Sequence, residues 1–506
     1  MSSLTQEANP PQQDPATGRA AARNADRGRR RRWLVLAVIA VAQLMVVLDA
    51  TIVNIALPSA QADLGFSDGD RQWVVTAYSL AFGSLLLIGG RIADLIGRKR
   101  ALIISLVGFA GASALAGAAS SFEVLVAGRA LQGAFGALLA PTALSLLTTT
   151  FTDAKERAKA FGIYGAVAGA GGGVGLLLGG FLTEHFDWRW TLYVNLIFAA
   201  VALVGALAFL PKQGRDKNVK IDWPGTVTVT AGLFALVYGF ANAEHDGWSS
   251  VGTWGFLAAG VVLIGVFVWL QNRVAHPLLP LRILRDRDRG AASIAMFVSA
   301  AGMFGVNLFL TYYLQQILGY SPMETGLAFL PMIVVVMIGS TVATTVLAPR
   351  VGPKPIVPLG MALSAVGLLW MTGLDADSTY LAHVMPPLLV FALGLGLVMS
   401  LSMSTATAGI DAADAGVGSA SVNTMQQIGG SIGTALLSTL AAGAATDYMV
   451  GKTPTPDAAI QAQLESYSTA YTWSAIFFAV GAVVCAFMFR RGAVKQDPDA
   501  APTVHM

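Results

Sequence analysis

Residues 27–58, RGRRRRWLVLAVIAVAQLMVVLDATIVNIALP, join a basic cluster to a long apolar run that contains a single acidic residue, Asp49. The run from Trp33 to Pro58 is about 25 residues long, enough for a helix to cross a bilayer core of roughly 30 Å. A cleaved signal peptide has a shorter apolar stretch that ends at a small-residue cleavage site. We therefore expect a retained first membrane span after a disordered basic cytoplasmic tail, residues 1–32. Binding of the RGRRRR cluster to anionic lipid is an alternative role for this tail.

The composition of the whole chain is that of an integral membrane protein. Of its 506 residues, 55% are hydrophobic and 12% are charged, whereas a soluble domain has about 25% charged residues. The single cysteine, Cys485, excludes an intramolecular disulfide, and the five histidines are scattered along the chain. We therefore expect no metal and no cofactor. The basic residues are spread over several loops, so we expect no nucleic-acid partner, and we expect a monomer. Because neither a soluble domain nor a catalytic cluster is visible, we also expect that the protein is not an enzyme.

Apolar runs of membrane length recur along the chain and predict an all-α membrane protein with fourteen spans. The expected spans are residues 33–57, 72–90, 101–119, 122–150, 159–183, 190–210, 223–243, 252–272, 290–316, 325–347, 355–374, 380–409, 416–443 and 470–490. The connection 444–469, rich in Thr, Pro, Ala and Gln, is expected to be flexible.

The basic residues predict how these spans are oriented. If the N-terminus is cytoplasmic, the segments on that side hold 28 of the 32 Lys and Arg residues, and the other side holds only Arg71, Arg189 and Lys452. Membrane proteins place their basic loops in the cytoplasm. We therefore expect a bacterial inner-membrane protein with both termini in the cytoplasm.

A second motif, GGRIADLIGRKR at residues 89–100, lies between the second and third expected spans. Its spacing G-x-x-x-D-x-x-G-R-K resembles the loop signature of the major facilitator superfamily. Four further stretches resemble signatures of its fourteen-span drug:proton antiporter branch: LDATIVNIALP (48–58), RALQGAFGALLAP (129–141), GLLLGG (175–180) followed by WRW (188–190), and VNTMQQIGGSIGTAL (422–436). The resemblance covers the chain from about residue 33 to residue 490.

The sequence departs from these signatures at two positions. Leu176 stands where the fifth-span signature usually has proline, and Leu95 stands where the loop signature usually has a basic residue. The first departure weakens the inference of antiport relative to facilitated transport in general. LAPRVGPKP, residues 347–355, resembles a degraded second copy of the loop motif.

The resemblance implies a major facilitator fold, with two six-helix bundles related by a pseudo-twofold axis. The bundles would comprise residues 33–210 and 290–490, two additional helices would occupy 211–289, and residues 491–506 would form a cytoplasmic tail.

Two charged residues, Asp49 and Arg129, lie well inside the expected spans. A charge at bilayer depth costs on the order of 2.5–3.5 kcal/mol, so such residues usually face a cavity or a partner. The helical rise of about 1.5 Å per residue places both at similar depth. We expect Asp49 to carry the coupled proton, with Arg129 as its partner; a fixed ion pair that only joins two helices is the alternative.

The resemblance also implies an inner gate at the 89–100 motif. Asp94 would pair with Arg98 or cap the positive end of a neighbouring helix. Asp411 and Asp414 could themselves cap the start of the expected span 416–443. The other residues assigned to this gate are Gly90, Gly97, Lys99 and Arg100.

Polar residues at depth are the candidates for the substrate cavity. They are Asn54, Tyr78, Gln132, Asn307, Gln315, Asn423, Gln426 and Gln427. Glycines are dense in the fifth span, where we expect close helix packing or, alternatively, a pliable helix. They form ridges at Gly165, Gly169 and Gly173 and at Gly171, Gly175 and Gly179, followed by Gly180.

These features predict an exporter of amphipathic drugs or natural products that uses the proton gradient. A transporter of another substrate class, such as amino acids, siderophores, lipids or metabolites, is the first alternative. A channel needs a selectivity filter and a sensor needs an output domain, and the sequence shows neither.

Overall fold

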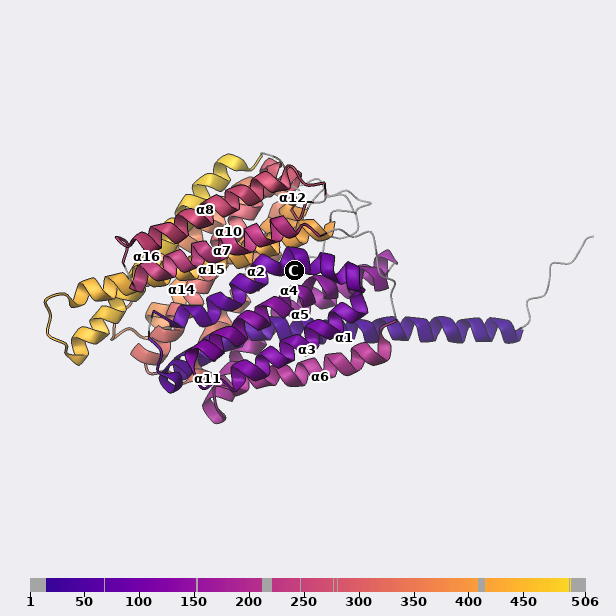
Figure 1. Ribbon diagram of the computed structural model, residues 1–506, viewed down its shortest axis with the longest axis horizontal. Helices are drawn as coiled ribbons and strands as arrows, with labels where there is room; N and C mark the ends of the chain where they lie inside the picture. Colours follow the sequence, from indigo (N-terminus) through magenta and orange to yellow (C-terminus); the bar gives the residue numbers. More distant parts are fainter. Residues whose placement is uncertain are drawn as a thin grey trace, which may run out of the picture.

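The computed structural model describes the chain apart from residues 1–14, 68, 152, 212–220, 246, 276, 280, 408–414, 491 and 493–506. Every regular element in the described residues is a helix (Figure 1). The first eight are α1 (Pro15–Leu64), α2 (Arg71–Ile96), α3 (Arg98–Gly117), α4 (Phe122–Thr150), α5 (Ala154–His185), α6 (Trp190–Phe209), α7 (Trp223–His245) and α8 (Val251–Gln271). The others, with η for π-helical turns, are α9 (Leu281–Arg285), α10 (Arg287–Tyr312), η1 (Tyr313–Ile317), α11 (Pro322–Thr341), η2 (Val342–Leu347), α12 (Ala348–Val351), α13 (Pro353–Met371), η3 (Tyr380–Val384), α14 (Met385–Thr407), α15 (Ala415–Met449) and α16 (Pro456–Met488).

The number of membrane-length helices agrees with the fourteen expected spans. In the described residues 13 helices are long and apolar enough to cross a membrane, and the count reaches 14 when the bent helix α2 is taken as one span. The two parts of α2, Arg71–Leu86 and Ile88–Ile96, meet at an angle of 60°. The protein is therefore a multi-pass membrane protein.

The helices form two halves with the same internal pairing. In the N-terminal half, α1 to α6, helix α4 packs on α2 and α3, and α1 packs on α5 and α6. In the C-terminal half, α10 to α16, helix α14 packs on α11 and α13, and α10 packs on α15 and α16. Two helix pairs join the halves, α2 with α15 and α5 with α11, and they are equivalent under this symmetry.

The two loop motifs occupy equivalent places in the halves. Gly97 separates α2 from α3 with a φ of 90°, and Gly352 separates α12 from α13 with a φ of 73°. A side chain with a Cβ is strained at such angles, so a glycine suits both breaks. The similarity of LAPRVGPKP to the first motif therefore has a structural basis.

The additional helices α7 and α8 form an antiparallel hairpin beside the two halves. Helix α7 packs on both α2 and α15, and α8 packs on α7 (Figure 1). Asp222 fixes the start of this hairpin: its carboxylate accepts hydrogen bonds from Gly225 N at 2.8 Å and from Gln271 Nε2 at 2.7 Å. A buried carboxylate is tolerated here because its oxygens are satisfied at the positive end of α7.

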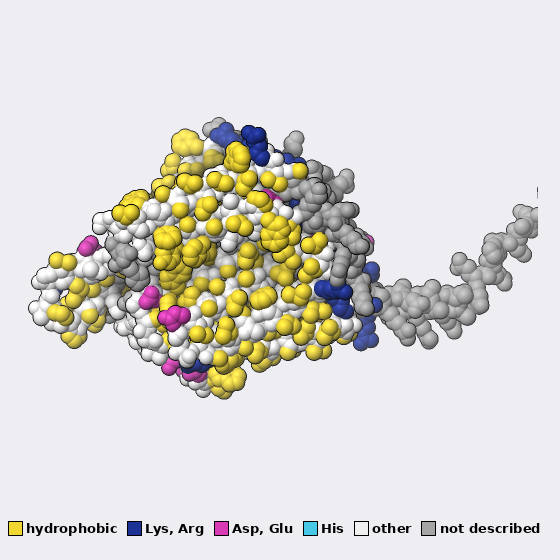
Figure 2. Space-filling model, in the orientation of Figure 1, with side chains coloured by type: hydrophobic (Ala, Val, Ile, Leu, Met, Phe, Trp, Pro, Cys, Tyr) yellow, Lys and Arg dark blue, Asp and Glu magenta, His cyan; other side chains and the backbone are white. Residues whose placement is uncertain are grey.

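On the face drawn in Figure 2, the charged surface residues lie toward the two ends of the bundle, with an apolar belt between them. We call the end where α2 meets α3 the basic end, because Arg32, Arg98 and Lys99 lie there. The other end, which carries Asp63 and Glu184, is called the opposite end. Such a belt is what lipid contact requires, since the hydrocarbon core offers no partner for charged or polar groups.

Three local expectations are corrected by the structure. Residues 15–32 belong to α1 rather than to a disordered tail, because this Ala- and Arg-rich segment has high helix propensity. The loop expected over residues 91–100 is reduced to Gly97 between two helices. The expected flexible connection 444–469 is mostly helical, because α15 continues to Met449 and α16 begins at Pro456, where the Thr455 side chain caps it (Figure 1).

Candidate functional site

The carboxylate of Asp49 is enclosed in the middle of the N-terminal half. Its side chain is 0% exposed, and the Arg129 side chain is 2% exposed. Arg129 Nη1 donates to Asp49 Oδ2 at 2.7 Å, so the pair is both charged and hydrogen-bonded. Helix α1 supplies the acid and α4 supplies the base, as the estimate of equal depth predicts.

Two amides complete the hydrogen bonding of the Asp49 carboxylate. Its Oδ1 accepts from Gln132 Nε2 at 2.8 Å and from Asn195 Nδ2 at 2.7 Å. Gln132 Nε2 also donates to Ser113 Oγ at 2.7 Å. The cluster therefore draws on α1, α3, α4 and α6, and both oxygens of the buried carboxylate have hydrogen-bond partners.

The guanidinium of Arg129 is fixed by contacts besides Asp49. Its Nε donates to Val74 O at 3.0 Å, and its Nη1 also donates to Gln132 Oε1 at 2.9 Å. The ring of Tyr78 lies against it, with Cζ 4.5 Å from the ring centroid. Since Val74 and Tyr78 belong to α2, the cation links α4 to a helix that also contacts the other half.

Asn195 and Ser113 are members of the cluster that the sequence did not identify. Asn195 is the one strongly polar residue within the apolar stretch YVNLIF of the sixth span, and that isolation is a usable signal. Ser113 has no comparable signal in the sequence, because serines are frequent within the spans of this chain. Tyr78 and Gln132, expected in the substrate cavity, instead contact the ion pair.

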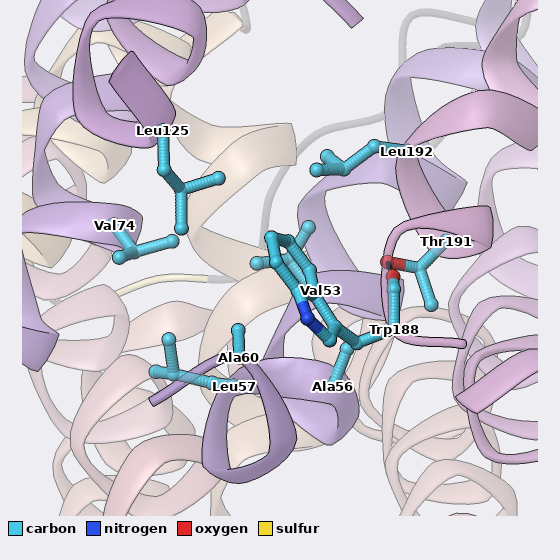
Figure 3. A pocket seen from close by; sticks show the side chains of 9 residues that line it. All are labelled: Val53, Ala56, Leu57, Ala60, Val74, Leu125, Trp188, Thr191 and Leu192. Carbon is cyan, nitrogen blue, oxygen red and sulfur yellow. Dashed lines mark hydrogen bonds between the residues drawn. The ribbon is translucent and has the colours of Figure 1, made fainter. Parts of the chain in front are cut away.

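An apolar pocket, whose lining side chains are drawn in Figure 3, lies next to the ion pair on the side of the opposite end. Val53 follows Asp49 by one turn, and Leu125 precedes Arg129 by one turn. The pocket is lined by Val53, Ala56, Leu57, Ala60, Val74, Leu125, Trp188, Thr191 and Leu192. These mostly apolar side chains form a layer between the Asp49 cluster and the opposite end. An ion inside this layer would have no charged partner.

The two halves touch each other at the opposite end. Tyr312 Oη donates to Gln61 Oε1 at 2.6 Å, and Gln315 Nε2 donates to Ile55 O at 3.0 Å. Arg71 lies over the Tyr312 ring, with Cζ 4.2 Å from the centroid. Because each of these contacts joins the N-terminal half to the C-terminal half, the molecule is closed at this end.

At the basic end, the ion pairs among the described residues lie within a single half. Asp94 Oδ1 lies 3.3 Å from Arg98 Nη2, which is one of the two arrangements expected for the motif. Lys99 Nζ donates to Leu210 O at 2.6 Å and so binds the end of α6. Arg100 is exposed, Gly90 is in ordinary contact with Pro141, and Asp411 and Asp414 lie outside the described residues.

The glycines of α5 allow close approach on two sides. A Cβ at Gly175 would lie 2.0 Å from Thr51 Oγ1, and one at Gly179 would lie 2.9 Å from Ile52 O, so this ridge and Gly171 face α1. Gly180 faces α11, where a Cβ would lie 2.6 Å from Pro322 O, and Gly173 also faces α11. Gly165 lies farther along the same helix, and the surroundings of Gly169 are outside the described residues.

The remaining candidates for the substrate cavity lie on three helices. Asn54 is buried and donates to Ala50 O within α1. Asn307 is 8% exposed on α10. Asn423, Gln426 and Gln427 lie half-buried on α15. Their place in a substrate cavity stays a prediction.

Comparison with known proteins gives relatives over nearly the whole chain. The family model described as Major Facilitator Superfamily matches residues 39–434. The puromycin resistance protein of Streptomyces alboniger is 46% identical over 474 residues, which are 93% of either chain. The cephamycin export protein of Amycolatopsis lactamdurans is 36% identical over 80% of this chain and 84% of its own length. A multidrug efflux pump of Mycolicibacterium smegmatis is 35% identical over 81% of each.

Solved structures agree on the fold. A bacterial homologue of the human lysosomal transporter Spinster aligns with a TM-score of 0.63 and 16% identity over 90% of this chain and 97% of that chain. A peptide transporter of the POT family aligns with a TM-score of 0.65 and 15% identity over 91% and 97%. The helix pairing, the repeated loop motif and these matches lead to one assignment: the chain belongs to the Major Facilitator Superfamily and is a transporter rather than an enzyme.

Proposed function

We propose that this transporter exports amphipathic drugs or natural products in exchange for protons. The observation that carries the proposal is the buried Asp49–Arg129 pair. Among the described residues, Asp49 is the one acidic side chain that is buried within a membrane-spanning helix. A proton that crosses the membrane on the protein needs a group that can bind and release it, and a carboxylate at membrane depth is such a group.

The surroundings of Asp49 suggest how proton binding is linked to shape. With Arg129, Gln132 and Asn195 in place, three donors stabilise the carboxylate. If the Arg129 side chain moves with α2 when the two halves separate, the Asp49 carboxylate loses its ion-pair partner. A proton bound to Asp49 would then replace the positive charge of Arg129. Protonation and conformation are thereby coupled through one hydrogen-bonded pair.

The basic end is proposed to face the cytoplasm. Arg32, Arg98 and Lys99 lie there, in keeping with the usual distribution of basic residues in membrane proteins. The contacts of Tyr312 with Gln61 and Arg71 then close the external side. In this orientation the described arrangement is one that receives substrate from the cytoplasm, and the monomer is proposed to be the working unit.

Relatives guide the choice of substrate. Three of them are named for puromycin resistance, cephamycin export and multidrug efflux. One charge moved through about 100 mV is worth roughly 2.3 kcal/mol, which supports a gradient of about fifty-fold for a neutral substrate exchanged against one proton. The alternative substrate classes are amino acids, siderophores, lipids and metabolites. They differ from drugs in polarity, and the same uptake assay tests them when such compounds are offered as substrates.

The test is uptake into inverted membrane vesicles driven by an imposed pH gradient, with puromycin and an amphipathic dye as substrates. We expect the Asp49→Asn variant to lose gradient-driven uptake when uptake is compared at equal amounts of protein in the membrane, because removing one partner of a buried pair also lowers stability. Glu465→Gln is the matched control, because it neutralises an exposed acid on α16. Full gradient-driven uptake by Asp49→Asn would contradict the proposal.

A further inference from the structure

The two helix pairs that join the halves differ in chemistry although they are equivalent by symmetry. Between α5 and α11 the close contacts along the helices are apolar or involve backbone, and at the opposite end the Glu184 carboxylate accepts from Met323 N at 3.0 Å. A Cβ at Gly326 would lie 2.6 Å from Leu176 O, and one at Gly173 would lie 3.5 Å from Ile333. The α5–α11 pair therefore behaves as an ordinary packed interface in a membrane protein.

The face of α2 that meets α15 is marked by Gly83. A Cβ there would lie 2.7 Å from the Cβ of Gln427 on α15. Thr76 and Ser79 precede Gly83 by seven and four residues, so helical periodicity places them on the same face. This face of α2 therefore presents two hydroxyls to the other half.

The matching face of α15 is marked by Gln427. Thr434 and Ser438 follow it by seven and eleven residues and share its face. The other sides of α15 are taken by α10 and α7, since Gly433 approaches Ala301 and Thr439 bonds to Phe240. Because α2 and α15 run in opposite directions, the hydroxyls of the two helices lie along the same stretch of the interface.

We call Thr76, Ser79, Thr434 and Ser438 the hydroxyl seam. Their exposed fractions are 1%, 1%, 1% and 4%. None of the four hydroxyls has a hydrogen-bond partner among the residues that the structure describes. Most buried hydroxyls of this chain are different: Thr142, for instance, donates to Leu138 O at 2.6 Å within its own helix. A buried hydroxyl without a partner is unfavourable, so the seam opposes its own closure.

Helix α7 lies along the seam and contacts the helices on both sides of it. The rings of Trp73 on α2 and Tyr238 on α7 are 6.2 Å apart, and Thr439 Oγ1 on α15 donates to Phe240 O on α7 at 2.8 Å. Helix α8 packs on α7 and is largely exposed, as a lipid-facing helix is expected to be. The seam is therefore separated from lipid by the additional hairpin.

We propose that the hydroxyl seam takes up water when the halves separate at the opposite end, and that α7 keeps this seam away from lipid. Water supplies the missing partners in the open arrangement, so the seam favours opening. The contacts of Arg71 and Tyr312 favour closure at the same end. The balance between the two sets how readily the transporter leaves the described arrangement, which gives the additional hairpin a role in the transport cycle.

The test compares the double variant Thr76→Val/Thr434→Val with the double serine variant at the same positions. Valine removes the unpaired hydroxyls at nearly constant shape, so the closed arrangement should become more stable. We expect a higher melting temperature in detergent together with a transport rate lowered roughly tenfold. The rate falls because opening no longer gains hydrogen bonds between water and these two hydroxyls. Serine retains the hydroxyls and should keep transport within about twofold of the parent.

Thr142→Val is the control for loss of a buried hydroxyl that does have a partner. It should lower the melting temperature without slowing transport tenfold. A double valine variant that melts lower, fails to fold or transports at the parental rate would overturn the seam proposal. The transport readout rests on the proposed function, whereas the melting comparison does not, so a chain that exports none of the offered compounds still tests the seam.

Discussion

Arg129 Nη1 lies 2.7 Å from Asp49 Oδ2 in side chains that are 2% and 0% exposed. Charges this deeply buried are stable only together. Removing one partner of a buried pair typically costs about 3–5 kcal/mol, whereas replacing both by apolar residues is often nearly neutral. The Asp49–Arg129 pair can therefore be tested by measuring protein stability, independently of transport.

We expect Arg129→Met to destabilise the protein by about 3–5 kcal/mol, because it leaves the buried Asp49 carboxylate without its cation. The double variant Asp49→Leu/Arg129→Met should melt at a higher temperature than Arg129→Met alone. Thermal unfolding of the purified variants in detergent measures both effects. Strictly additive losses in the double variant would show that the two side chains do not depend on each other.

Neighbouring glycines on α2 should respond very differently to alanine. At Gly89 a Cβ would lie 2.1 Å from the backbone oxygen of Ala137, so α2 must move away from α4. At Gly90 the nearest contact would be an ordinary 3.6 Å to Pro141. We expect Gly89→Ala to cost about 1–3 kcal/mol through overpacking and Gly90→Ala to be neutral or slightly stabilising. Melting temperatures that are equal for the two variants would contradict this packing.

The contact of Arg71 with the Tyr312 ring should hold the opposite end closed. A cation over an aromatic ring contributes about 0.5–2 kcal/mol, more when it is desolvated. We expect Arg71→Met and Tyr312→Leu each to shift the population toward opening at this end, and the double variant to shift it little further. Spin labels at the exposed positions Glu123 and Asp377 report the distance between the halves. Unchanged distance distributions in both single variants would argue against a closing role.

The sequence alone predicts the spans and the pairing of the central charges, because both depend on properties along one helix. Hydropathy gives the length of each span, and the rise per residue gives the depth of Asp49 and Arg129. The α2–α3 motif was identified by its resemblance to the family's loop signature, and the structure adds that its Gly97 has a positive φ.

What the sequence did not predict depends on how helices are rotated against one another. Asn195 joins the Asp49 cluster only because α6 turns that face inward. The contact between Arg71 and Tyr312 links residues far apart in the chain, and hydropathy carries no signal for it. The helical ends of α15 and α16 were missed for another reason: Thr, Pro and Gln suggest a loop, but Thr455 and Pro456 together start a helix.

The most direct measurement of the central claim is substrate-driven proton movement in proteoliposomes that contain a trapped pH indicator. Addition of an exported compound should move protons in the parent protein and in Glu465→Gln. In Asp49→Asn the same compound should still bind, as measured by a shift in melting temperature, but should move no protons. Proton movement of parental size in Asp49→Asn would contradict the assignment of Asp49 as the coupling group.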